Sequence, residues 1–237
     1  MAKARGPHGM LVPPRTGRAA SEEKCVTLAA IIVGVAFGVG GALAERLASV
    51  WPPDEAQRRP VGVRTAALAV VSGTVAAAVV LRSELPWWAT AVHLVLLALL
   101  LVLTATDLEQ RRLPHVLLDP LIVLAAAFVV FNPGMDPVSA LIGAAAAVGF
   151  LGALALVVRG GLALGDLYLV APIGLMLGWP AIFTALFAAA FLAAGTSIAL
   201  LALRRVGMRS YIPFGPFLVA GAAIALLTDP RLLVVVR

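Results

Sequence analysis

The stretch that decides the fold runs from residue 87 to residue 114 and reads WWATAVHLVLLALLLVL followed by TATDLEQRRLP. Its first part, residues 87–103, contains no Asp, Glu, Lys or Arg and is long enough to cross a hydrocarbon layer as a helix. Asp107 falls just past this apolar run, and Pro114 is expected to end the local helix. A carboxylate there is reachable by water but lies beside a medium that penalises its charge. It is either a solvated cap between two helices or a catalytic or ion-handling group, which would need a partner.

The composition indicates an integral membrane protein. Of the 237 residues 62% are hydrophobic and 13% are charged, whereas a soluble domain is about half apolar and a quarter charged. The apolar runs have helix length and do not alternate as membrane strands do, so the expected fold class is all-α. In so apolar a chain the net charge of +6 indicates cytoplasmic loops and lipid headgroups rather than nucleic acid. The single cysteine, Cys25, excludes an internal disulfide or a four-cysteine zinc site.

The apolar runs predict a polytopic bundle of about eight transmembrane helices. The expected spans are residues 25–43, 65–81, 87–103, 116–131, 138–158, 162–177, 181–203 and 211–228. We expect residues 1–24 to form a polar disordered tail, residues 25–86 a two-span region with a short cytoplasmic loop, residues 87–228 the main membrane domain, and residues 229–237 a short C-terminal tail.

The arginines predict which side of the membrane each loop faces. The loops after spans one, three, five and seven contain Arg46, Arg58, Arg59, Arg64, Arg111, Arg112, Arg159, Arg204, Arg205 and Arg209. The opposite loops contain only Arg82. The positive-inside rule therefore makes the first set of loops cytoplasmic. The five basic residues of the N-terminal tail fall on the other side by this count, so either the tail is tolerated there, or the true start of the chain lies later, or one span is miscounted.

A second acid, Asp166, is expected on the same side as Asp107. It lies in GGLALGDLYL, residues 160–169, where small residues allow close helix packing, and a carboxylate in an apolar span is a functional candidate. Two carboxylates within a few ångström share one proton, so one can act as base and the other as acid in peptide hydrolysis. The same pair could move protons or cations, or be structural, and the residues alone leave these three readings open. Asp119 and Asp136 are weaker candidates.

Three motifs together resemble those of the prepilin peptidase family of membrane aspartic peptidases. They are Asp107 with Arg112-Leu113-Pro114, then Leu164-Gly165-Asp166, then IPFGPFL at residues 212–218. The resemblance covers about residues 87–226 and makes residues 87–228 a peptidase-like membrane domain. It implies that Asp107 and Asp166 are catalytic, with no metal or cofactor. The residues implied in substrate binding or structural support are Gly165, Tyr168, Pro114, Pro213 and Gly215.

The resemblance also implies a substrate and a location. The substrate would be a type IV prepilin or a pseudopilin-like protein, whose leader is removed at the cytoplasmic face of the bacterial inner membrane. The stretch GVGGALAERL, residues 38–47, is similar to one that in longer members precedes a domain with two Cys-x-x-Cys pairs, associated with N-methylation. Here about twenty polar residues follow, without cysteine. The expectation is a reduced member with peptidase activity and without that domain.

Two departures from the family pattern leave other functions open. Ala163 stands where the family has the first Gly of Gly-x-Gly-Asp, and Tyr168 stands where it commonly has Lys, which removes a positive charge near Asp166. One alternative is therefore a non-catalytic membrane component of a pilus or secretion assembly. Another is a small proton-coupled transporter, which would predict inverted repeats and an acid near the middle of the membrane. The sequence shows no clear repeat.

Overall fold

The structure, a computed structural model, describes residues 16–49, 61–111, 113–157, 164–204, 207 and 213–234. The regular structure in these residues is entirely helical, which confirms the all-α prediction. The elements are α1 (Thr16–Ala48), α2 (Val63–Arg82), α3 (Trp87–Gln110), α4 (His115–Phe131), α5 (Pro137–Val157), α6 (Leu164–Leu177), α7 (Ala181–Ala202), α8 (Gly215–Thr228) and the short 3-10 helix η2 (Pro230–Leu233).

The helices differ in length, and two of the short helices, α6 and α8, hold motifs named in the sequence analysis. Five of the described helices, α1, α2, α3, α5 and α7, are long and apolar enough to cross a membrane. The other three are shorter: α4 has 17 residues, and α6 and α8 have 14 each. At about 1.5 Å per residue a helix of this last length reaches only about 21 Å, less than the roughly 30 Å of a hydrocarbon core. Asp166 and Gly215, in the first turns of α6 and α8, are buried, so these two helices begin within the bundle.

Several helix ends differ from the sequence-based expectation, among them the end of α1, which lies at Ala48 rather than at residue 43. Helix α1 begins at Thr16 rather than at residue 25, because no proline falls between Pro14 and Pro52 and the polar residues there include good helix formers. Residues 16–24 of the predicted disordered tail are thus helical, and residues 1–15 lie outside the described residues.

Helix α3 continues for seven residues beyond residue 103 and ends at Gln110. Arg111 then adopts a left-handed backbone with φ of 54°, and Pro114 precedes α4. Helix α8 begins at Gly215 rather than at residue 211, with Pro216 in its first turn, a position where the missing N–H of proline does no harm. The longer α3 moves Asp107 from the expected loop into a helical turn.

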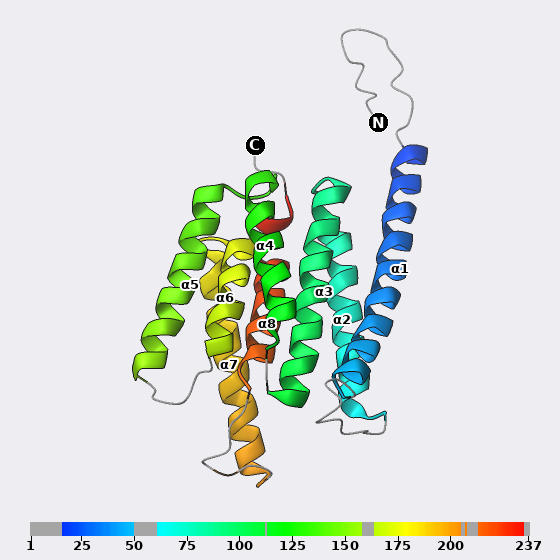
Figure 1. Ribbon diagram of the computed structural model, residues 1–237. Coiled ribbons are helices and arrows are strands. Elements are labelled where there is room, and N and C mark those ends of the chain that lie inside the picture. Colours follow the sequence, from blue (N-terminus) through cyan, green and yellow to red (C-terminus); the bar gives the residue numbers. More distant parts are fainter. Residues whose placement is uncertain are drawn as a thin grey trace, which may run out of the picture.

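The helices run alternately up and down (Figure 1), so that the C-terminal ends of α1, α3, α5 and α7 and the N-terminal ends of α2, α4, α6 and α8 share one end, the lower one in the view. Helix α3 packs against α1, α2, α4 and α8, and α6 packs against α4, α5, α7 and α8. Buried side chains such as Leu100, Ile173 and Leu226 form the core. Outward side chains such as Val35 and Phe191 are exposed and apolar, as expected for a surface covered by lipid.

Candidate active site

Asp107 lies in the last turn of α3 and is buried, with only 5% of its surface exposed. It is therefore less open to water than the sequence suggested, because α3 continues past it. Two nearby hydroxyl groups on the same helix donate to backbone carbonyls instead of to this carboxyl group. The Thr104 hydroxyl donates to the Leu100 carbonyl at 2.8 Å, and the Thr106 hydroxyl donates to the Leu103 carbonyl at 2.9 Å. Its Oδ2 atom is buried and has no hydrogen-bond partner among the described residues. The carboxyl group thus retains bonding capacity.

Asp166 lies in the first turn of α6, and 2% of its surface is exposed. The N-terminal end of a helix carries a partial positive charge and unpaired N–H groups, both of which favour a carboxylate. This explains how an acid can be placed inside an apolar bundle at this position. The residues just before it, 158–163, including Ala163, lie outside the described part of the chain.

Both acids are buried, and the charge of Asp166 acts on the carboxyl group of Asp107. In the structure α4 and α8 each pack against both α3 and α6, and so connect them. The relative position of the two acids therefore depends on two helices that do not contribute either acid.

Gly215, the first residue of α8, lies against Asp107. A Cβ atom added at Gly215 would be 2.5 Å from Oδ2 of Asp107 and 3.6 Å from Cδ2 of Leu169. A Cβ this close would force the carboxyl group or the start of α8 to shift, so glycine lets α8 approach this carboxyl group without displacing it. The beginning of α8, with its partial positive charge, thereby comes next to an acid at the C-terminal end of α3, where the dipole of α3 itself is unfavourable to it. The first and third motifs meet here.

The second motif meets the residues that follow Asp107. A Cβ at Gly165 would be 3.0 Å from Cδ1 of Leu113, the residue before Pro114. The ring of Tyr168 packs edge-on against that of His115, with 5.5 Å between centroids, and 51% of Tyr168 is exposed. Tyr168 therefore contacts the beginning of α4 on the exposed side of α6, while Asp166 faces inward.

The remaining residues named from the sequence lie around this centre. Pro213 is half-buried and lies two residues before the start of α8. Asp119 is exposed, with its carboxylate 3.8 Å from the His115 ring. The Asp136 carboxylate accepts a hydrogen bond from the Ser139 N–H at 3.1 Å at the beginning of α5. These two acids occupy exposed positions, unlike the buried pair.

Sequence reasoning missed a third buried acid. Glu45 of α1 is 8% exposed, and its Oε2 atom accepts a hydrogen bond of 3.0 Å from the Thr65 hydroxyl of α2. Nearby, the Gln110 side chain donates to the Ala48 carbonyl at 2.9 Å. These contacts join the ends of α1, α2 and α3 just beyond Asp107. The signal in the sequence that could have identified Glu45 was the position of an acid near the end of the first apolar run.

His93 was also missed, although it stands inside the apolar run of residues 87–103. Its side chain is fully buried, Nδ1 lies 3.0 Å from the Ala89 carbonyl, and its ring packs edge-on against Phe128 at 5.0 Å. It lies nearly four helical turns before Asp107 along α3. His93 therefore does not belong to the carboxylate site.

Fold and site define an integral membrane protein with a helical bundle and two buried, interacting aspartates at one end. Residues 94–198 match the type IV leader peptidase family, and the chain belongs to this family. No solved structure matches the chain.

Several curated proteins are similar to the chain, each named prepilin leader peptidase/N-methyltransferase. That of Burkholderia pseudomallei is 35% identical over 176 residues, 71% of this chain and 56% of the relative. That of Aeromonas hydrophila is 31% identical over 173 residues, 71% of this chain and 59% of the relative. That of Bacillus subtilis is 31% identical over 133 residues, 56% of this chain and 54% of the relative. The chain thus spans little more than half the length of these relatives.

Proposed function

We propose that the chain is an aspartic endopeptidase that removes the leader peptide of type IV prepilin-like proteins. The observation that carries the proposal is the buried pair itself: Asp107, with an unpartnered Oδ2, interacting with Asp166. Membership of the family and the names of the relatives support the choice of substrate.

The chemistry follows from the pairing. Two buried carboxyl groups whose charges act on each other do not both ionise readily, so one holds a proton that the other lacks. The ionised group takes a proton from a water molecule as the water attacks the scissile carbonyl carbon, and the protonated group donates to the carbonyl oxygen. When the tetrahedral intermediate collapses, a proton passes to the leaving amine and the C–N bond breaks. The ability of Asp107 Oδ2 to accept a new hydrogen bond suits it to hold the attacking water.

The proposed site faces the cytoplasm of a bacterial inner membrane. Arg46, Arg64, Arg111 and Arg204 lie at the same end of the bundle as the two acids, which supports this orientation by the positive-inside rule. In a variant lacking Cys25, a cysteine at residue 112 or 205 should resist a membrane-impermeant thiol reagent applied from outside, whereas Asn132→Cys should react. The reverse labelling would overturn the orientation.

Cleavage is tested by co-expressing a prepilin and following the loss of its leader as a gel shift. The wild type should cleave, and Asp107→Asn, Asp166→Asn and the double variant should all be inactive to the same extent, because residues that act as a unit are not additive. The surface variants Asp119→Asn and Asp136→Asn, at matched membrane levels, are the controls and should cleave. Full cleavage by either active-site variant would exclude the two-carboxylate mechanism, and a wild type that cuts no prepilin would exclude the peptidase.

A further inference from the structure

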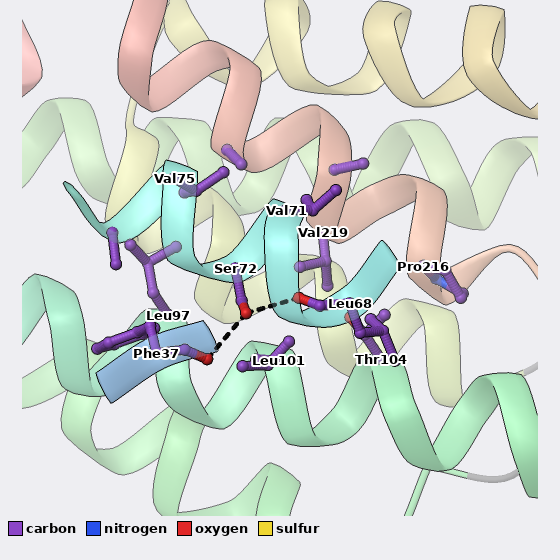
Figure 2. A pocket seen from close by; sticks show the side chains of 13 residues that line it. Phe37, Leu68, Val71, Ser72, Val75, Leu97, Leu101, Thr104, Pro216 and Val219 are labelled. Carbon is purple, nitrogen blue, oxygen red and sulfur yellow. Dashed lines mark hydrogen bonds between the residues drawn. The ribbon is translucent and has the colours of Figure 1, made fainter. Parts of the chain in front are cut away.

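Helices α1 and α2 pack closely against each other. The Ser72 hydroxyl of α2 is 2.9 Å from the Phe37 carbonyl of α1, and Figure 2 shows this contact beside the apolar groove between α2, α3 and α8. A Cβ atom added at Gly41 of α1 would be 2.9 Å from the Leu68 carbonyl oxygen of α2, so the two backbones lie close together, as small residues allow in membrane helix packing. The two helices therefore form one unit, the α1–α2 pair.

The α1–α2 pair packs against the part of α3 that carries Asp107. A small apolar cluster there consists of three buried alanines, Ala44 and Ala48 of α1 and Ala105 of α3, with Leu68 and Val102 packed against them. Ala105 precedes Asp107 by two residues, so this contact lies within one helical turn of the acid. The small side chains let the end of α1 come close to α3. The α1–α2 pair can therefore influence where the last turn of α3 lies.

Two polar side chains at the end of α3 also contact this pair. The Gln110 side-chain amide donates to the Ala48 carbonyl of α1 at 2.9 Å. That carbonyl is one of the last four of its helix, which have no partner within the helix. The Glu109 carboxylate, whose side chain is 9% exposed, lies 3.9 Å from the Arg64 guanidinium of α2. Hydrogen bonding to α1 and charge pairing with α2 thus both act on the turn that follows Asp107.

The last turn of α3 depends on contacts with other helices. The Asp107 carbonyl accepts the Arg111 N–H at 2.9 Å, and Arg111 has a left-handed backbone with φ of 54°. Residues other than glycine adopt this backbone at a cost in free energy, and helix ends tend to fray. Most helical stability in proteins comes from tertiary packing. The contacts with the α1–α2 pair therefore decide how firmly the turn that carries Asp107 is held.

We propose that Gln110 is a positioning residue for the peptidase reaction: by bonding to the end of α1 it holds the last turn of α3, and so keeps the Asp107 carboxyl group against Gly215 of α8. Gln110 takes no part in the proton transfers and acts only through Asp107. Because Gln110 follows Asp107 by three residues, both lie in the same turn, and loosening one end of that turn displaces the other. This role rests on the proposed function and gives the α1–α2 pair a part in it.

The first experiment removes the hydrogen bond. Gln110→Met keeps the length of the side chain and loses the N–H donor. Arg82→Met is the matched control, because the Arg82 side chain donates to the Leu227 carbonyl near the end of α8, a contact of the same kind at the opposite end of the bundle. At equal membrane levels and a permissive temperature, Gln110→Met should lower kcat for leader cleavage about 10- to 100-fold, because a displacement of about 1 Å at a catalytic group can cost about 10²-fold.

The kinetic constants separate positioning from other roles. Gln110→Met should leave KM within about twofold of the wild-type value, since an interaction that acts on the reacting groups alone changes kcat. Arg82→Met should keep the wild-type kcat and KM. A raised KM with an unchanged kcat would show that Gln110 binds substrate, and equal losses in the two variants would show a general effect on the bundle. Either result would overturn the positioning role.

A second experiment, hydrogen–deuterium exchange, does not depend on cleavage. The Arg111 N–H is bonded to the Asp107 carbonyl, so a peptide containing residue 111 reports the opening of the last turn of α3. Its exchange should be about fivefold faster in Gln110→Met, the effect of losing one hydrogen bond, and unchanged in Arg82→Met. Unchanged exchange in Gln110→Met would contradict the positioning role alone, even if the wild type cleaves. Faster exchange in Gln110→Met, with a wild type that cuts no prepilin, would contradict the proposed peptidase and show that Gln110 still holds the end of α3.

Discussion

Two buried acidic regions lie at the same end of the bundle and differ in what their carboxyl groups contact. Glu45 accepts a hydrogen bond from the Thr65 hydroxyl and joins α1 to α2. Asp107 has a buried oxygen without a partner among the described residues and lies near a second carboxyl group, that of Asp166. Burial is similar in both regions. The comparison teaches that unfilled bonding capacity and a second acid, rather than burial, separate a candidate catalytic carboxylate from a structural one.

The largest expected effect tests this contrast directly. Asp107→Asn or Asp166→Asn should lower the rate of leader cleavage by about 10²–10⁴-fold, because each removes a proton-transfer group that the other cannot replace. Glu45→Gln should keep most of the activity, because the amide oxygen can still accept the Thr65 hydroxyl. The rates are measured in membranes with equal amounts of each variant. If Glu45→Gln proves as inactive as Asp107→Asn, the distinction between the two regions is wrong.

A smaller loss of cleavage activity should follow from Gly215→Ala. The added Cβ would be 2.5 Å from Oδ2 of Asp107, so α8 or the carboxyl group must shift, and overpacking of this kind costs about 1–3 kcal/mol. We expect the cleavage rate to fall on the order of tenfold while the protein remains in the membrane. Gly195→Ala is the control, because a Cβ there meets no other atom within 4 Å. Equal rates for the two variants would argue against close contact at Gly215.

A substitution in the structural region around Glu45 should lower the stability of the protein. Thr65→Val keeps the shape of the side chain but removes the donor to Glu45, and an unsatisfied buried acceptor costs about 1–3 kcal/mol. The thermal unfolding temperature in detergent should fall, while cleavage at a permissive temperature should persist. Thr74→Val on the same helix is the matched control, because the exposed Thr74 hydroxyl bonds only to carbonyls of its own helix among the described residues. A normal unfolding temperature for Thr65→Val would remove the structural role assigned to Glu45.

The smallest effect is expected from Tyr168→Lys, which restores the cation typical of the family. Tyr168 is half exposed, and solvent-exposed charge pairs contribute only about 0–1 kcal/mol. The cleavage rate should change by no more than about fivefold, and the change should shrink at high salt. Tyr168→Gln, which is polar but uncharged, separates charge from the loss of the ring contact with His115. A gain that persists at high salt, or one that appears only with Lys in an otherwise inactive protein, would show that the missing cation limits activity.

The sequence by itself determined the class of fold and the two acids. Apolar runs of helix length without charge can satisfy their backbone groups in lipid only as helices, so residues 87–103 predicted a spanning helix before any contact was known. The cost of placing a carboxylate beside hydrocarbon made Asp107 and Asp166 candidates. The local pattern also predicted the start of α4 after Pro114. It failed at Thr16 and Gln110 because polar helix formers continue a helix beyond its apolar part.

Only the tertiary structure decided what these acids contact. That a side chain at Gly215 would displace α8 or the Asp107 carboxyl group depends on the approach of α8 to Asp107, which no spacing within either helix reveals. The partnership of Glu45 with Thr65, and the groove between α2, α3 and α8, likewise join residues far apart in the chain. Such contacts depend on how helices pack side by side, and this is determined by the shapes of whole faces rather than by the local sequence at any one position.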